Sequence, residues 1–195
     1  TWSLRKSEEN IWRWYDALSV PALVGLAIGA LGAFFGGSAY GTPTDLPWGV
    51  TYESQIVKYT VPIHPVQLYL IPLIGLLLWS KKYFKKHYPV FEQDGVTALY
   101  LATGFSLIYF MLEFLRGDDT LLILGVRFPM ILSAIFFLIG AARLTKTLKQ
   151  YKLNLDAIEK NKKIDAEVSM VKTNIIVQER IKDNLVSEIH EITTQ

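Results

Sequence analysis

Four apolar segments, each about as long as a membrane-crossing helix, constrain this fold more than any other feature. They cover residues 20–37, 62–79, 96–115 and 121–142. A helix needs about 20 mostly apolar residues to cross the hydrocarbon core of a bilayer. We therefore predict an all-α fold, a polytopic transmembrane helical bundle of about four spans over residues 1–144. Buried core helices of a soluble protein are the alternative explanation for such segments.

The lysine and arginine residues predict how this bundle is oriented. They cluster before the first segment, between the second and third segments, and after the fourth: Arg5, Lys6, Arg13, Lys81, Lys82, Lys85, Lys86, Arg143, Lys146, Lys149 and Lys152. The loops 38–61 and 116–120 hold only Lys58 and Arg116, and Arg127 lies at the edge of the fourth segment. Because basic loops stay on the cytoplasmic side, both chain ends are expected in the cytoplasm.

Composition excludes several kinds of function. The chain has no cysteine, which excludes disulfides, thiolate metal sites and a cysteine nucleophile. The basic residues flank apolar segments instead of covering one exposed face, so nucleic-acid binding is not expected. The sequence begins at Thr1 and not at methionine, from which we expect a chain that lacks its natural start.

Residues 145–195 are expected to form a charged helical tail in the cytoplasm. Apolar residues recur there at alternating steps of four and three, and the phase continues through two polar residues: Ile164, Val168, Val171, Ile175, Gln178, Lys182, Leu185, Ile189 and Ile192. The two polar residues favour a solvated amphipathic helix, and an oligomerising coiled coil is the alternative.

Glycines and prolines mark the predicted outer loop after the first segment. Gly29, Gly32 and Gly41 lie near the end of that segment, where a missing side chain allows another helix or a ligand to approach closely. Helix packing is the simpler explanation for the first two. Residues 40–50 read Tyr-Gly-Thr-Pro-Thr-Asp-Leu-Pro-Trp-Gly-Val, and the two prolines exclude a helix there.

Polar and ionisable residues lie at the outer ends of the second and third segments. His64, Gln67 and Tyr69 open the second segment, where they can bind a polar head group or relay a proton. Glu113 and Arg116 close the third segment, and their spacing of three puts them on one helix face. An ionisable residue inside a span indicates a functional site. A structural ion pair is the alternative.

In this order, the motifs resemble those of the prolipoprotein diacylglyceryl transferase family over about residues 14–142. The motifs are the glycine-rich segment end, the loop 40–50, His-Pro-Val-Gln-Leu-Tyr at 64–69, and Glu-Phe-Leu-Arg-Gly-Asp at 113–118. The resemblance implies a multi-pass enzyme of the bacterial inner membrane with seven spans, of which this chain would hold the C-terminal part. Such an enzyme moves the diacylglyceryl group of phosphatidylglycerol onto a lipobox cysteine thiol, and glycerol phosphate leaves.

The resemblance also implies which residues form the site. The catalytic residues would be His64, Arg116 and Glu113, and the substrate-binding residues Gly29, Gly32, Gly41, Gln67, Tyr69 and Asp118. Neither a metal nor an organic cofactor is implied. The expected partners are phosphatidylglycerol, a prolipoprotein signal peptide with its lipobox cysteine, the membrane lipids and, through the tail, a cytoplasmic partner.

The sequence departs from the family pattern at charged and polar positions. The family signature reads Gly-Arg-x-Gly-Asn-Phe-x-Asn-x-Glu-x-x-Gly, and the same frame covers residues 29–41. Ala30 stands where the family has the arginine that holds the lipid phosphate, and Ala33 and Ser38 replace the first asparagine and the glutamate. Tyr109 replaces a second arginine, and Leu70 replaces an acid.

These departures leave the activity open between two hypotheses. In the first, the chain is a divergent active transferase that uses Arg116 and His64. In the second, it is a non-catalytic relative that binds lipid or lipoprotein precursors in the membrane. A four-span channel or transporter subunit is a third possibility, but it requires a continuous polar stripe through several spans, which the sequence lacks.

Overall fold

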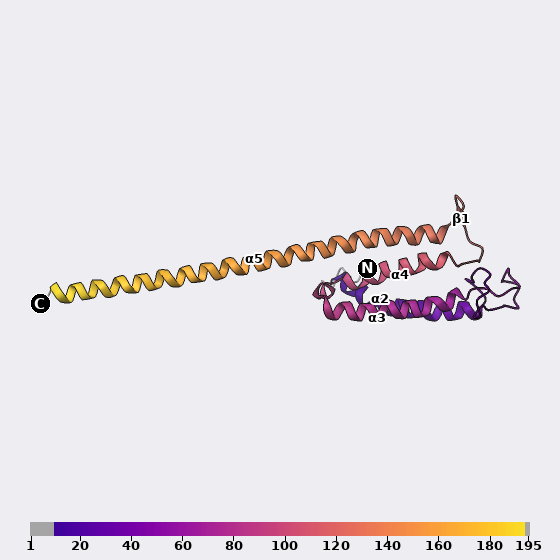
Figure 1. Ribbon diagram of the computed structural model, residues 1–195, viewed down its shortest axis with the longest axis horizontal. Coiled ribbons are helices and arrows are strands. Elements are labelled where there is room, and N and C mark those ends of the chain that lie inside the picture. Colours follow the sequence, from indigo (N-terminus) through magenta and orange to yellow (C-terminus); the bar gives the residue numbers. More distant parts are fainter. Residues whose placement is uncertain (1–9, 194–195) are drawn as a thin grey trace. The chain divides into compact units, whose positions relative to one another are not determined.

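The computed structural model describes residues 10–193, and the side chains through Lys182 except that of Glu179 (Figure 1). The chain divides into two compact units, Thr1–Leu148 and Lys149–Gln195. The described residues are mainly helical: α2 (Ile11–Phe35), α3 (Val66–His87), the 3-10 turn η1 (Pro89–Glu92), α4 (Val96–Glu113) and α5 (Phe128–Thr193), with a hairpin of β1 (Leu122–Ile123) and β2 (Val126–Arg127).

Three helices in the described part of the chain are long and apolar enough to cross a membrane. They are α2, α4 and the part of α5 over Phe128–Lys182. Large apolar side chains such as Ile28, Phe35 and Leu138 lie exposed on them, as lipid-facing residues do. The prediction of an all-α membrane bundle is therefore confirmed. The apolar part of α3 ends in a lysine cluster, so its crossing stays a prediction.

Helices α2, α3 and α4 pack against one another in the first unit (Figure 1). Their shared core consists of buried apolar side chains: Leu23, Ile74, Leu77 and Leu101. A Cβ on Gly104 would collide with Leu77, and one on Gly140 would collide with Thr103. These two glycines therefore let α4 pack closely against α3 and against α5, as small residues do between membrane helices.

Helix α2 begins at Ile11, well before the predicted segment at residue 20. Asn10 caps it by accepting a hydrogen bond from the Trp12 N–H at 3.2 Å. Asp16, on the first turns of α2, accepts hydrogen bonds at 2.7 Å from the backbone N–H groups of Gly95 and Ala98. These donors belong to the first turn of α4 and have no partner inside that helix. Asp16 therefore fixes the start of α4 against α2.

In two of the predicted segments, the helix begins several residues after the start of the apolar stretch. Residue 62 was expected inside the second segment, but Ile63 instead exchanges backbone hydrogen bonds with Val50, both at 3.0 Å. Helix α3 therefore starts at Val66, after Pro65. Residues 121–127 form the hairpin, whose turn has positive φ at Leu124 (51°) and Gly125 (80°). Helix α5 accordingly starts at Phe128.

Candidate functional site

The loop between α2 and α3 is joined to the end of α4 by backbone hydrogen bonds. The Gly41 N–H donates to the His64 carbonyl at 3.1 Å, the Thr42 N–H to the Leu115 carbonyl at 2.8 Å, and the Gly117 N–H to the Tyr40 carbonyl at 3.0 Å. A Cβ on Gly117 would lie 2.6 Å from the Gly41 carbonyl oxygen, and one on Gly41 would collide with His64. Glycine is thus required where these three segments meet.

An ionic cluster of two carboxylates and two guanidinium groups lies at this junction. The Glu113 side chain is fully buried, and its Oε2 accepts from Arg127 Nε at 2.8 Å. Its Oε1 lies 3.4 Å from Arg116 Nη1, so the expected pair forms, although α4 ends at Glu113 and Arg116 lies beyond the helix. Arg116 binds Asp118 through both carboxylate oxygens at 3.0 and 2.6 Å. Arg127 Nη2 also reaches Asp118, at 2.8 Å.

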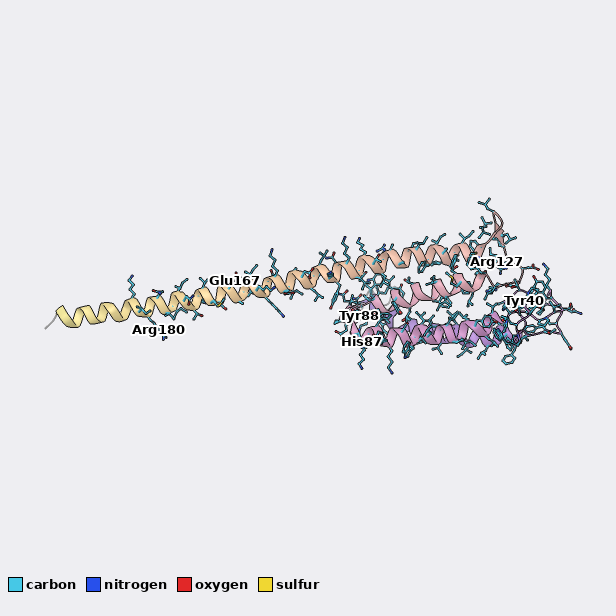
Figure 2. The ribbon with its side chains drawn as sticks, in the orientation of Figure 1. Tyr40, His87, Tyr88, Arg127, Glu167 and Arg180 are labelled. Atoms are coloured by element: carbon cyan, nitrogen blue, oxygen red, sulfur yellow. The ribbon has the colours of Figure 1, made fainter. Side chains whose placement is uncertain are left out.

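Arg127, the last residue of β2 and directly before α5, completes this cluster (Figure 2). It connects Glu113 and Asp118 and also donates to the Asp118 backbone carbonyl at 2.8 Å. From the sequence, Arg127 was predicted only to lie at the edge of the fourth apolar segment. No local spacing could have revealed it, because the hairpin brings it back to the end of α4.

Charge compensation favours the ionised forms of Arg116, Asp118 and Arg127. Burial alone would raise the pKa of Asp118, but the hydrogen bonds and charges of Arg116 and then Arg127 lower that pKa below its ordinary value. Burial opposes the charge on Arg116, yet its hydrogen bond to Asp118 and the neighbouring charges raise its pKa. The pKa of Arg127 is raised likewise, against burial, by Glu113 and Asp118. Two positive and two negative groups leave no net charge.

This electrostatic arrangement predicts how stability depends on pH. Because the pKa of Asp118 is lower when folded than the ordinary value of about 3.9, its stabilising contribution is complete above that value. The contribution is lost as the pH falls through the folded pKa. We expect Asp118→Asn to lower the melting temperature at pH 7 and to reduce the further loss below about pH 4. Thermal melts of detergent-solubilised protein test this. An unchanged acid-dependent loss in Asp118→Asn would contradict it.

A cavity of about 250 Å³ lies beside the cluster, between α2, α3 and α4. Its lining is mostly apolar, with polar groups from α3 and α4: Gly25, Leu26, Gly29, Ala30, Ala33, Ala39, Val66, Gln67, Leu70, Tyr109, Leu112, Glu113 and Arg116. Two buried oxygens, Gln67 Oε1 and Glu113 Oε1, have no hydrogen-bond partner among the described residues. The cavity therefore offers hydrogen-bond acceptors to a ligand that carries donors.

The polar groups of the cavity are held in fixed positions. Gln67 Nε2 donates to the Ser38 carbonyl at 2.6 Å, which orients the side-chain amide. Arg116 Nη1 donates to the Tyr109 hydroxyl at 2.9 Å. Among the described lining residues, Arg116 alone carries a positive charge.

The structure brings together four of the nine predicted site residues. Gly29, Gln67, Glu113 and Arg116 all line the cavity. Asp118 lies outside the lining but binds Arg116 directly. The two remaining glycines do not line it: Gly41 lies at the loop junction, and Gly32 faces open space.

His64 and Tyr69 form a separate group with Trp48. The Tyr69 hydroxyl lies 3.3 Å from His64 Nδ1 and accepts from Trp48 Nε1 at 2.8 Å. Neither His64 nor Tyr69 lines the cavity. The loop between α2 and α3 nevertheless connects them to it, because Gly41 pairs with both His64 and Arg116 along the backbone.

The departures from the family pattern converge on the same cavity. Ala30, Ala33, Leu70 and Tyr109 all contribute to its lining. Ser38, the fifth departure, binds Gln67 through its carbonyl. Substitutions that are scattered in the sequence thus change the lining of one cavity. This lining is more apolar than the family signature implies.

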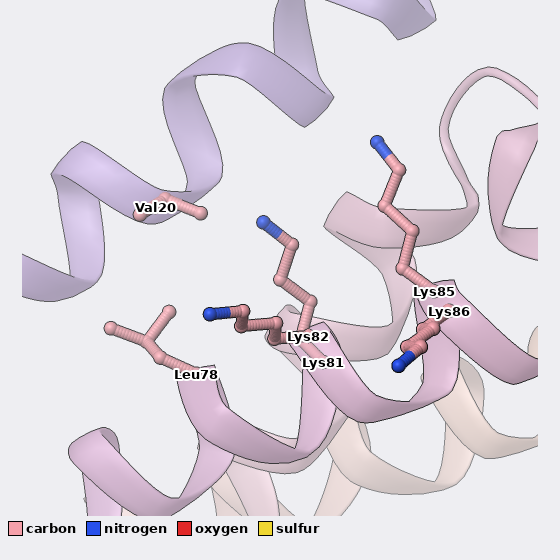
Figure 3. Close-up of a pocket in the computed structure, with 6 residues that line it drawn as sticks. All are labelled: Val20, Leu78, Lys81, Lys82, Lys85 and Lys86. Carbon is pink, nitrogen blue, oxygen red and sulfur yellow. The ribbon is translucent and has the colours of Figure 1, made fainter.

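A second cavity, of about 430 Å³, lies toward the opposite end of α3 (Figure 3). Val20 and Leu78 form its apolar lining, and the lysine side chains extend around it: Lys81, Lys82, Lys85 and Lys86. The two ends of α3 therefore differ in charge. One end adjoins a neutral ionic cluster, and the other carries four lysines.

The fold and the site together define a polytopic helical membrane protein with a cavity at the ends of its helices. The sequence profile of the prolipoprotein diacylglyceryl transferase family matches residues 1–146. The chain belongs to this family.

Curated relatives agree with this assignment, and all three cited here are phosphatidylglycerol–prolipoprotein diacylglyceryl transferases. That of Campylobacter lari is 31% identical over 159 residues, which are 77% of this chain and 54% of the relative. That of Polynucleobacter asymbioticus is 31% identical over 134 residues, 66% of this chain and 48% of the relative. That of Campylobacter hominis is 30% identical over 150 residues, 74% and 50% respectively. The chain thus spans about half the length of these relatives.

Proposed function

We propose that this chain serves the transfer of a diacylglyceryl group from phosphatidylglycerol to the lipobox cysteine thiol of a prolipoprotein. The observation that carries the proposal is the cavity, in which Arg116 lies with Gln67 and Glu113 between apolar helix faces; Gln67 Oε1 and Glu113 Oε1 accept no hydrogen bond there from the described residues. An apolar opening suits acyl chains, and the polar end suits a head group. Family membership and the names of the relatives support the reaction.

The reaction requires charge stabilisation at the leaving group. The thiol sulfur attacks the glycerol carbon that carries the phosphate, a C–S bond forms, and the C–O bond to the phosphate breaks. Glycerol phosphate leaves with the bonding electrons, and the thiol proton passes to a base. We assign the phosphate to Arg116, since a guanidinium group binds phosphate through paired, charged hydrogen bonds. Glu113, buried and 3.4 Å away, holds Arg116 in position.

We assign the thiol proton to His64. An imidazole can accept a proton near neutral pH, and Tyr69 orients this one through Nδ1. His64 lies on the loop that pairs with Gly41, which in turn pairs with Arg116. The protein thereby connects the base to the phosphate-binding group through one layer of backbone hydrogen bonds.

The charge pattern supports a proposal for membrane orientation. We place the protein in the bacterial inner membrane with both chain ends in the cytoplasm, four crossings within residues 1–144, and residues 145–195 as the tail. The lysine-lined end of α3 then faces the cytoplasm, as basic loops do. The cavity and its neutral cluster face outward.

A non-catalytic, lipid-binding relative is the second candidate, and one observation favours it. Ala30, Ala33, Leu70 and Tyr109 leave Arg116 as the only cation of the described lining, and Asp118 already pairs with it. Loss of a preorganised charge partner typically lowers the rate of a reaction by about 100-fold to 1000-fold.

Rescue of cells depleted of their own transferase distinguishes the two candidates. We expect the protein to restore growth and thioether-linked lipoprotein, and Arg116→Ala to lower the thioether yield by about 100-fold. Ala30→Arg should raise the yield, because it places a second cation in the cavity. Gly75→Ala, in open space on α3, is the matched control. No rescue by a folded, membrane-inserted protein would favour the non-catalytic candidate.

A further inference from the structure

The tail helix carries an apolar stripe that is exposed within its own unit. Within the second unit, Ile164, Val168, Val171 and Ile175 are between 45% and 60% exposed. Only one ion pair stabilises the described tail from within, between Lys163 and Glu159 at 2.9 Å. Most helix stability in proteins comes from packing of an apolar face and not from propensity alone. We therefore expect a continuous helix with this stripe exposed to pack against a partner.

The stripe follows the heptad pattern of a coiled coil. Alternating core positions, called a and d, are occupied in turn: a by Asn161, Val168, Ile175 and Lys182, and d by Ile164, Val171 and Gln178. Branched apolar residues occupy both kinds of position in the middle of the stripe, over residues 164–175. An asparagine at a single a position is a known determinant of register, because it pairs with the asparagine of an aligned neighbour. The later apolar positions, Leu185, Ile189 and Ile192, lie outside the described side chains.

Charges beside the stripe match those of an identical helix in parallel register. In such a pair, each g residue faces the e residue five positions further along the other helix. Lys160 at g faces Asp165 at e, and Glu167 at g faces Lys172 at e. Both facing pairs have opposite charge. All four side chains are exposed, and none of them forms an ion pair in the described structure; Glu167 extends from α5 in Figure 2.

We propose that the tail forms a parallel coiled coil with a second copy of this chain, centred on residues 157–182. The interaction is independent of the transfer reaction, because no residue of the cavity takes part in it. A membrane surface is a poorer occupant of the stripe. Amphipathic helices at membranes flank their apolar face mainly with lysine and arginine, whereas acids and lysines flank this one in equal number at the e and g positions: Lys160, Asp165, Glu167 and Lys172.

Disulfide cross-linking tests this proposal cleanly, because the full chain contains no cysteine. Val171→Cys lies at a d position, and Thr173→Cys lies two residues away on the outer face as the matched control. The variants are oxidised mildly as detergent-solubilised full-length protein. We expect covalent dimers from Val171→Cys and roughly tenfold fewer, or less, from Thr173→Cys, because d positions face each other across the two helices. Equal yields would overturn the proposal. So would the absence of covalent dimers from Val171→Cys.

A charge exchange tests the register separately. In the parallel dimer, residue 167 of each helix faces Lys172 of the other helix. Glu167→Lys therefore creates two pairs of facing lysines and should weaken self-association roughly tenfold. Adding Lys172→Glu restores opposite charges and should restore the dimer. Light scattering of the purified protein gives the oligomeric state, and circular dichroism confirms that each variant stays helical. A double variant as monomeric as Glu167→Lys, or a wild-type protein that is monomeric at all concentrations, would contradict the parallel pairing.

Discussion

Arg127→Ala is expected to destabilise the first unit by roughly 3–5 kcal/mol, the usual cost of removing one partner from a buried ion pair. Arg127 provides the closest ionic contact of Glu113, whose side chain is fully buried. Without it, the Glu113 carboxylate keeps only Arg116 at 3.4 Å, and Asp118 loses one of its two guanidinium partners. Melting temperatures of the variant and the wild type in detergent measure the loss.

Lys58→Ala is the control for Arg127→Ala. Lys58 pairs with Asp119 at 3.5 Å, but both side chains are largely exposed, at 60% and 87%. Exposed ion pairs contribute less than about 1 kcal/mol. Arg127→Ala should therefore lower the melting temperature far more than Lys58→Ala. Equal, small effects would show that the cluster does not hold the loops to α4.

Gly41→Ala is expected to have the second large effect. The added Cβ would collide with the His64 carbonyl oxygen and would lie 2.8 Å from a methyl carbon of Val66. The His64 carbonyl is backbone, so the loop itself must move, and overpacking of this kind costs roughly 1–3 kcal/mol. Since Gly41 also pairs with Arg116, we expect the variant to lose function beyond its loss of stability.

Gly75→Ala provides the comparison for Gly41→Ala, because a Cβ there meets nothing within 4 Å. In a helix, alanine in place of glycine usually adds about 0.5–1 kcal/mol of stability. We expect a neutral or raised melting temperature from Gly75→Ala and a lowered one from Gly41→Ala. The same response at both positions would contradict the close approach of the loop to α3.

The sequence predicted the membrane bundle well because span length and charge clusters are local properties. It also predicted the Glu113–Arg116 contact, which a spacing of three residues dictates. The sequence predicted the boundaries of the helices less accurately. The pairing of Ile63 with Val50 and the positive φ of Gly125 delay α3 and α5, and neither is visible in hydropathy.

The missed features all depend on residues distant in the sequence. The hydrogen bonds from Gly95 and Ala98 to Asp16 join residues that are about 80 positions apart in the sequence. Arg127 reaches Glu113 only because a hairpin lies between them. Side-chain chemistry predicted the candidate site residues, whereas the meeting of Ala30 and Tyr109 in one cavity required the fold.

Photo-cross-linking of a photoactivatable phosphatidylglycerol to the purified protein tests the lipid-binding cavity most directly. We predict adducts on peptides from the ranges 25–33, 66–70 and 109–116, as mapped by mass spectrometry. Gly29→Leu should abolish them by filling the cavity, and Gly75→Leu, an equal change in open space, should leave them unchanged. Adducts confined to other surfaces of the helices, or insensitive to Gly29→Leu, would contradict the assignment of this cavity to the lipid.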